Sequence, residues 1–335
     1  MRTVSQVELV APKARSLVWH GGALVDVAAG WLRYTLDGAV PVRRYSPYGH
    51  GFDAAVPAPA GDVVALVTST GTKALLLEAG GKVIRELNRS YYCAEAYRYP
   101  LALFTLPDGR TGLVHCPEHY NRLEIEVART GELLTGSQAR DPGDFFHSRL
   151  AVSPDGRFLL SAGWVWHPLS MLEIYDLPRA LEQPGALDGM PRNAPWTREA
   201  GVTEISGACF SGPDVVVSTS AEVPDTDEPG QLGPCMLARW STARQQFAWI
   251  RQLGETAGDL LPVGDSILAL YQCPRLYAAA TGELQAEWTG LHTGQADSSI
   301  VGDKAFSGPA RVAVDEPGQR FAVAGEDRIN VIQLG

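Results

Sequence analysis

Short apolar runs alternate along this chain with turns rich in proline, aspartate and glycine. The clearest copy extends from Leu150 to Gly163, where two apolar runs flank the turn Pro154-Asp155-Gly156. An Asp-Gly pair between two such runs is a strong β-hairpin signal, because glycine readily adopts the positive φ that tight hairpin turns require. The pattern therefore predicts two antiparallel strands at this position.

Weaker copies of this hairpin recur along the whole chain, roughly every fifty residues. They span residues 54–67, 101–115, 208–219, 260–271 and 311–324. A second pair of apolar runs follows several of the hairpins, as at 123–134 and 276–288. A repeated unit of four antiparallel strands, named A to D in chain order, is typical of a propeller blade.

The number of repeated units is seven. They begin near Ser16, Phe52, Tyr99, Ser148, Ser206, Asp259 and Pro309. The last unit, 309–335, supplies only three strands, and the alternating segment at about 4–10 is the natural fourth strand of that blade. Such closure joins the two termini and removes a free sheet edge. We therefore expect residues 1–335 to form a single all-β domain, a seven-bladed β-propeller of four-stranded antiparallel blades. Six blades would leave the N-terminal strand or one hairpin unexplained.

Three short motifs resemble those of a known repeat family. Ser153 to Arg157 reads SPDGR, Tyr175-Asp176 ends an apolar run, and Gly49-His50 precedes the second unit. They resemble the A–B turn, the WD dipeptide and the GH element of WD40 and YVTN-type propellers. The specific motif is confined to the fourth blade, so the buried hydrogen-bond relay of regular WD40 repeats is not implied. The resemblance implies an interaction scaffold more often than an enzyme.

Composition and charge narrow the classes of partner. The formal net charge is −10 and no long basic run occurs, which argues against nucleic-acid binding. No window approaches 18 consecutive apolar residues, and residues 1–10 lack the apolar core of a secretory signal, so we expect no membrane partner. The five cysteines are an odd number without a CxxC motif, which indicates reduced thiols and a cytoplasmic location.

In a propeller the D–A and B–C connections form one face, which we call the loop face. Six of the seven histidines and most of the exposed-looking aromatic residues fall in these connections. The A–B and C–D turns are short and carry little chemistry. Because connecting loops on a rigid scaffold usually carry function, we expect any site to lie on the loop face.

Two aromatic segments of the loop face are candidates for binding. Trp164 and Trp166, followed by His167, would project to one side of an extended segment and offer a stacking platform. Tyr91, Tyr92, Tyr97 and Arg98 belong to residue types favoured at interface hot spots, and we add His119 and Arg149 to this binding set. The alternative for both segments is packing between blades.

Two further groups could carry chemistry. His115, Cys116 and His119 include imidazole and thiolate groups that zinc prefers, but no second Cys/His pair has zinc-finger spacing, so they are weak metal candidates and we expect no cofactor. His50, Asp53 and His147 lie at A-strand entrances with Arg98, Arg149 and Asp259. A histidine beside a carboxylate can act as a general acid or base. The alternative, which we favour, is a water-filled channel lined by satisfied polar groups.

Two other segments, the B–C loop of blade 5 and the connection between blades 4 and 5, are expected to be irregular. The composition of residues 222–230 indicates an acidic flap rather than a calcium-binding loop. Residues 177–196 are predicted to leave the sheet as a long connection that begins with one helical turn.

The leading hypothesis is a cytoplasmic binding module that recognises a protein or peptide partner through the loop face. The alternative is an enzyme or small-molecule binder, such as a metal-assisted lactonase or a hydrolase, with its site at the channel mouth. No GxSxG, P-loop, GxGxxG or HExxH motif is present, although propeller enzymes need no linear motif. A structural subunit without a site is the third possibility.

Overall fold

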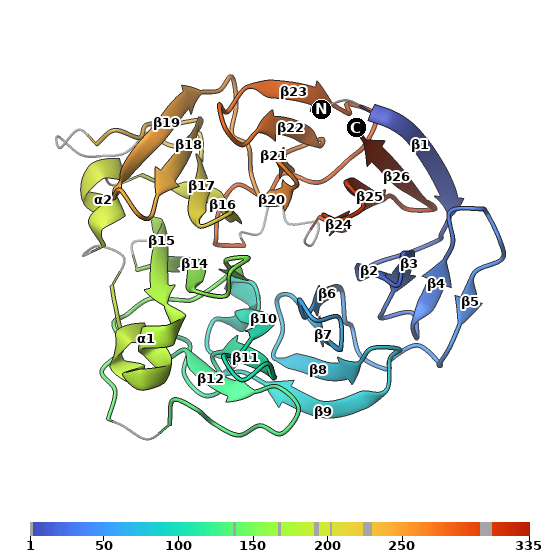
Figure 1. Cartoon of the computed structure of the whole chain (residues 1–335), viewed down its shortest axis with the longest axis horizontal. Coiled ribbons are helices and arrows are strands. Elements are labelled where there is room, and N and C mark those ends of the chain that lie inside the picture. The colour runs from blue at the N-terminus through green and yellow to red at the C-terminus, as the bar shows by residue number, and fades with distance from the viewer. Residues whose placement is uncertain are drawn as a thin grey trace.

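The computed structural model describes residues 3–136, 139–166, 169–190, 194–201, 203–223, 230–301 and 310–335. Seven antiparallel sheets follow one another in chain order around a central channel (Figure 1). This is the seven-bladed β-propeller that the repeat predicts. The innermost strands are β2 (Leu17–His20), β6 (Ala54–Pro57), β10 (Leu101–Thr105), β13 (Leu150–Val152), β16 (Ile205–Ser211), β20 (Leu260–Val263) and β24 (Val312–Asp315).

The ring is closed by the N-terminal strand, as expected. Strand β1 (Thr3–Val10) pairs antiparallel with β26 (Arg328–Leu334) and completes a sheet of order β1-β26-β25-β24, in which β25 is Arg320–Ala324. Figure 1 shows the two ends of the chain beside each other at this sheet. Closure gives β26, which would otherwise be the edge strand of blade 7, a paired neighbour and ties the first residues to the last.

Four other blades also contain four strands. Their remaining strands are β3 (Ala23–Asp26), β4 (Leu32–Tyr34) and β5 (Val42–Arg43) in blade 1, β7 (Val63–Val67), β8 (Lys73–Glu78) and β9 (Val83–Asn88) in blade 2, β17 (Asp214–Thr219), β18 (Met236–Ser241) and β19 (Gln246–Gln252) in blade 5, and β21 (Ser266–Ala269), β22 (Arg275–Ala278) and β23 (Leu284–Glu287) in blade 6.

Blades 3 and 4 have three named strands within the described residues. Blade 3 consists of β10, β11 (Thr111–His115) and β12 (Glu124–Val127), followed by a single bridge between Glu126 and Leu133. Blade 4 consists of β13, β14 (Phe158–Val165) and β15 (Leu169–Asp176).

Helical segments follow β15 in place of a fourth strand. They are α1 (Leu177–Glu182), the 3-10 helix η2 (Pro184–Leu187) and α2 (Pro195–Ala200). The carboxylate of Asp176 accepts a hydrogen bond from the Arg179 N–H at 3.0 Å and so caps α1. Pro178 lies in the first turn and has no backbone N–H. A strand inside a sheet needs that N–H for its hydrogen bonds, whereas the first turn of a helix does not. The helical turn expected at the start of this excursion is therefore confirmed.

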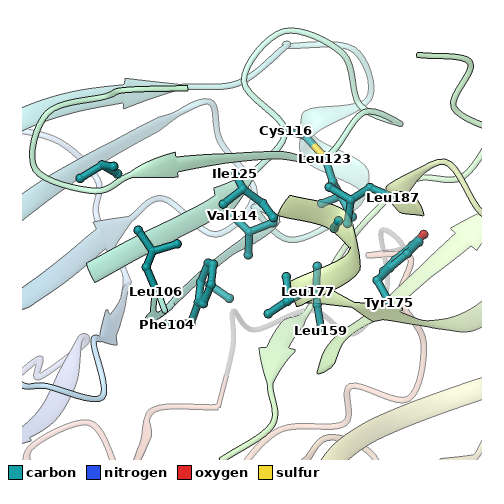
Figure 2. Packing of buried hydrophobic residues seen from close by; sticks show 13 residues of the cluster. Phe104, Leu106, Val114, Cys116, Leu123, Ile125, Leu159, Tyr175, Leu177 and Leu187 are labelled. Atoms are coloured by element: carbon teal, nitrogen blue, oxygen red, sulfur yellow. The ribbon is translucent and has the colours of Figure 1, made fainter. Parts of the chain in front are cut away.

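The core lies between neighbouring blades rather than at the centre of the ring. Leu113 packs in the cluster shared with blade 2, whereas the next residue, Val114, packs in the cluster shared with blade 4. Successive side chains of a strand point to opposite faces, so a strand buried on both faces reads as a continuous apolar run. Figure 2 shows the second cluster, where Phe104 and Ile125 of blade 3 lie near Leu159 of blade 4.

The connection between β23 and β24 reaches blades 3 and 4 on the loop face. The Val301 N–H donates to the Ala96 carbonyl at 2.7 Å, and Ile300 forms an antiparallel bridge with Tyr97. The Ser299 N–H donates to Ser170 Oγ at 3.1 Å. This segment, 298–301, thus links the connection between blades 6 and 7 to the opposite side of the ring. No helix in the described residues has the length and apolar character needed to span a bilayer.

Candidate functional site

Six aromatic side chains gather on the loop face above blades 3 and 4. Five come from the β9–β10, β11–β12, β12–β13 and β14–β15 connections, which the ring brings to the same side, and Trp164 lies at the end of β14. We call them the aromatic cluster, and its members are Tyr92, Tyr97, Tyr120, Phe146, Trp164 and Trp166. Four of these were predicted as binding residues from two separate segments. The structure places the two segments against each other.

Phe146 lies at the centre of the aromatic cluster. Its ring stacks on Trp164 with centroids 3.9 Å apart and on Tyr120 with centroids 4.1 Å apart. Backbone hydrogen bonds exchanged between Phe146 and Trp164, at 2.9 and 3.1 Å, fix the two segments in this register. Trp166 stands nearly perpendicular to both rings, 5.6 Å from Phe146 and 5.2 Å from Trp164. Such stacked and edge-to-face pairs are the arrangements that aromatic quadrupoles favour.

The cluster has a buried layer and an exposed layer. Trp164, Tyr97 and Phe146 are buried. Trp166 and Tyr92 are each 46% exposed, and the neighbouring Tyr91 is 85% exposed. Trp164 therefore packs inside the cluster, whereas Trp166 presents its ring to solvent, and a binding role for the pair stays a prediction. His167, the third predicted residue of this segment, lies outside the described residues.

A buried arginine fixes the connection that carries the tyrosines. Arg89 donates to the carbonyl oxygens of Ala94 at 2.7 Å and Tyr97 at 3.0 Å, and its guanidinium lies 4.4 Å from the Tyr97 ring centroid. These contacts order the short 3-10 helix η1 (Ala94–Ala96) and the tyrosines on either side of it. Two buried polar atoms of the cluster, Trp164 Nε1 and Tyr97 Oη, have no hydrogen-bond partner within the described part of the chain.

The channel mouth is crossed by an ion-paired triad. Arg98 lies 2.6 Å and Arg149 3.4 Å from the two carboxylate oxygens of Asp259, which belongs to the opposite side of the ring. Arg149 also donates to Ser299 and to the carbonyl oxygens of Ala162 and Ser206. Burial alone would raise the pKa of Asp259, but the two guanidinium groups hold that pKa below its usual range.

The triad lines a central cavity of about 1250 Å³, whose walls are the innermost strands of all seven blades. Asp53 also lines this cavity and accepts a hydrogen bond from the Ser69 N–H at 2.7 Å. The sequence places Asp53, Arg98, Arg149 and Asp259 correctly at A-strand entrances. Their acceptors and donors are largely used within the protein, as in the polar-lined channel that we favoured.

The two histidines expected beside this channel occupy different environments. His147 is buried, with Nδ1 3.1 Å from Ser161 Oγ and Nε2 3.2 Å from the Asn121 carbonyl oxygen. Burial lowers the pKa of His147 to about 3, so the ring is neutral at physiological pH. His50 is exposed and makes an edge contact with Phe52. Neither is among the residues that line the central cavity.

The weak metal candidates are also separated by environment. His115 is buried between blades, 2.7 Å from Glu126, which pairs with Arg85 of blade 2 at 3.0 Å. Cys116 is buried, and burial raises the pKa of its thiol. His119 is exposed in the β11–β12 connection. Among the described residues, no group of three or more His, Cys, Asp or Glu side chains is arranged to hold a metal ion.

Sequence reasoning missed Phe146, although it is the central ring of the cluster. It lies within Phe145-Phe146-His147, just before an A strand, where a phenylalanine is usually assigned to the core. Tyr120, which follows the predicted residue His119, was not predicted either. The signal available for both was their position in loop-face connections next to those carrying the tyrosines and tryptophans.

Comparison with known proteins adds no family to this description. No protein-family model matches the sequence, and no curated protein matches it. The chain is thus assigned by its architecture, as a seven-bladed β-propeller with an aromatic cluster on its loop face.

Proposed function

We propose that this chain is a binding module that recognises a protein or peptide partner through the loop face. The carrying observation is the exposed layer of the aromatic cluster, formed by Tyr92 and Trp166 with Tyr91 beside them. Large aromatic side chains that are accessible and already packed on a buried base are typical of interface hot spots.

Preorganisation supports this proposal. Trp164 and Phe146 hold Trp166 from one side, and Tyr120 holds Tyr92 at a centroid distance of 5.2 Å. Because binding costs side-chain entropy at each ordered residue, rings that are already held in place lose less on association. The cluster therefore offers contact area at a low entropic cost.

The resemblance of the SPDGR turn to WD40-type propellers also supports a scaffold function. Blade 4 carries the SPDGR turn, in which Asp155 accepts hydrogen bonds from Ser153 and from the Arg157 N–H, and Gly156 has a φ of 72°. We propose that the chain is a WD40-like module acting in the cytoplasm, in keeping with its five free cysteines.

The alternative, an enzyme or small-molecule binder at the channel mouth, has weaker support. Its charged residues, Arg98, Arg149 and Asp259, are bound to one another across the mouth. Its best acid–base candidate, His147, is buried and hydrogen-bonded within the protein at both ring nitrogens. A reacting group needs access to its substrate as well as a suitable pKa.

Partner capture with a matched control tests the proposal. We expect the double variant Tyr92→Ala/Trp166→Ala to lose partners that the wild-type chain retains from lysate after cross-linking. The control, Val40→Ala/Val83→Ala, removes exposed apolar side chains elsewhere and should retain them. Identical capture by the wild type and by both variants, each with an unchanged melting temperature, would contradict the proposal.

A further inference from the structure

Exposed carboxylates lie in the connections that carry the aromatic cluster. Asp144 accepts a hydrogen bond from the Tyr120 hydroxyl at 2.7 Å, which places its carboxylate at the edge of the cluster. Glu118 lies two residues before Tyr120, and Glu95 lies in the helical turn between Tyr92 and Tyr97. All three carboxylates are exposed, and none forms an ion pair within the described residues.

The positive charges of the same connections are already paired or buried. Arg89 is buried and donates to backbone carbonyls. The other arginines each pair with a carboxylate, as Arg98 and Arg149 with Asp259, Arg122 with Glu124, Arg129 with Asp62, and Arg140 with Asp188. The described parts of these connections contain no lysine. Among the described Asp, Glu, Arg and Lys side chains of these connections, the exposed ones without an ion pair are therefore negative.

We propose that the partner segment bound by the aromatic cluster is basic, with lysine or arginine side chains over the rings of Tyr92 and Trp166 and near Glu95, Glu118 and Asp144. This inference rests on the proposed function and specifies its partner. A cation over an aromatic face is attracted by the ring quadrupole, and nearby carboxylates add Coulomb attraction. A guanidinium can also stack on a ring while donating to a carboxylate, so arginine fits this surface best.

The same features argue against other occupants. An acidic segment or a nucleic-acid backbone would bring its negative charges against exposed carboxylates, while the described arginines of these connections are already buried or paired. A purely apolar segment would pack on the rings but leave the carboxylates without a partner. The net charge adds to this preference, because a protein with a formal net charge of −10 attracts basic molecules at long range.

The first experiment compares four dye-labelled, end-capped tetrapeptides of Arg, Lys, Gln and Glu by fluorescence anisotropy. We expect affinity to fall in the order Arg, Lys, Gln, Glu, with a gap of about tenfold or more between Arg and Gln. Affinity for the Arg peptide should fall severalfold as salt is raised from 0.05 to about 0.5 M, because exposed charges are screened. Equal affinity for the Gln and Arg peptides would overturn the inference.

Charge-neutralising variants locate that binding. Glu118→Gln/Asp144→Asn keeps the side-chain shapes and an acceptor for the Tyr120 hydroxyl, and it should weaken the Arg peptide about threefold to tenfold. The matched control, Glu86→Gln/Glu182→Gln, removes the same charge from exposed, unpaired positions on β9 and α1 and should change affinity less than twofold. Equal losses in both double variants would mean that only overall charge attracts the peptide, and the inference would fall.

Failure of this inference can be distinguished from failure of the proposed function. If Tyr92→Ala/Trp166→Ala loses captured partners while Glu118→Gln/Asp144→Asn keeps them at both low and high salt, the aromatic binding surface stands and its basic partner does not. If Tyr92→Ala/Trp166→Ala keeps its partners and its affinity for the Arg peptide, both proposals fail. Melting temperatures of all variants check that each remains folded.

Discussion

Two neighbouring regions of the loop face use their side chains in opposite ways. At the channel mouth, Arg98, Arg149 and Asp259 face one another across the ring and are largely buried. Above blades 3 and 4, Tyr92 and Trp166 pack on a buried aromatic base yet leave 46% of each side chain exposed. The charged groups at the mouth pair with one another, whereas the cluster keeps aromatic surface exposed to solvent.

This difference shows why residue type alone does not identify a binding surface. Arginine and tyrosine are both favoured at interfaces, but an arginine whose donors reach internal carbonyls and a carboxylate has little left to offer a partner. An aromatic ring held on one face by its neighbours still has its second face free. The cluster is therefore the better candidate for recognition, and the mouth for holding the ring together.

The largest effect is expected from the buried tryptophan of the cluster. Trp164→Ala should lower the free energy of unfolding by about 3–5 kcal/mol, because it removes a buried ring stacked on Phe146 and leaves a cavity. Urea denaturation measures this change. A loss below about 1 kcal/mol would show that the inner layer does not support the exposed one.

Breaking the triad at the mouth should be nearly as costly. Asp259→Asn leaves Arg98 and Arg149 close together and largely buried without their shared carboxylate, which should destabilise the fold by about 3–5 kcal/mol. If the protein remains folded, partner capture should survive, since the triad lies outside the cluster. A stable variant that loses its partners would instead assign recognition to the mouth.

A third change tests a buried carboxyl whose pKa is not lowered by any arginine or lysine of the described residues. Glu173 in β15 is buried, and burial raises its pKa to about 7 from 4.5. The folded state therefore holds this proton more tightly than the unfolded state, and stability falls as pH rises from about 4.5 through 7. Glu173→Gln should be close to neutral at pH 4.5 but stabilise the protein by about 3 kcal/mol at pH 8. A stability difference that does not change between these pH values would contradict this assignment.

The smallest stability effect, with the clearest functional effect, is expected at the exposed ring. Trp166→Ala should change the free energy of unfolding by less than about 1 kcal/mol, because half of the side chain already contacts solvent. It should nevertheless weaken partner binding by about 2 kcal/mol, as expected for a hot-spot tryptophan. Calorimetric titration with a captured partner, alongside a melting curve, separates the two quantities.

Most of the architecture could be predicted from local sequence. Each hairpin carries its own turn signal, so the seven innermost strands begin close to the expected positions, and β1 closes the ring as expected. The helical turn after Asp176 was expected, and the structure shows Asp176 as its cap and Pro178 in its first turn. These features depend on nearby residues and on a period that the sequence repeats.

The details of the site depend on long-range contacts that no local pattern contains. Arg149 and Asp259 are 110 residues apart, and only closure of the ring makes them partners. The sequence likewise does not show which tryptophan of the pair is buried. That depends on Phe146, which belongs to another connection and stacks on Trp164 only in the folded chain. The internal hydrogen bonds of His147 also follow from tertiary packing.

The central claim is that partners contact the exposed layer of the aromatic cluster. Hydroxyl-radical footprinting with mass spectrometry measures it most directly, because Tyr91, Tyr92 and Trp166 are exposed and such rings oxidise readily. We predict that a captured partner slows oxidation of these three residues and leaves exposed aromatic residues elsewhere, such as Tyr45, unchanged. Unchanged oxidation of all three in the bound complex would contradict the claim.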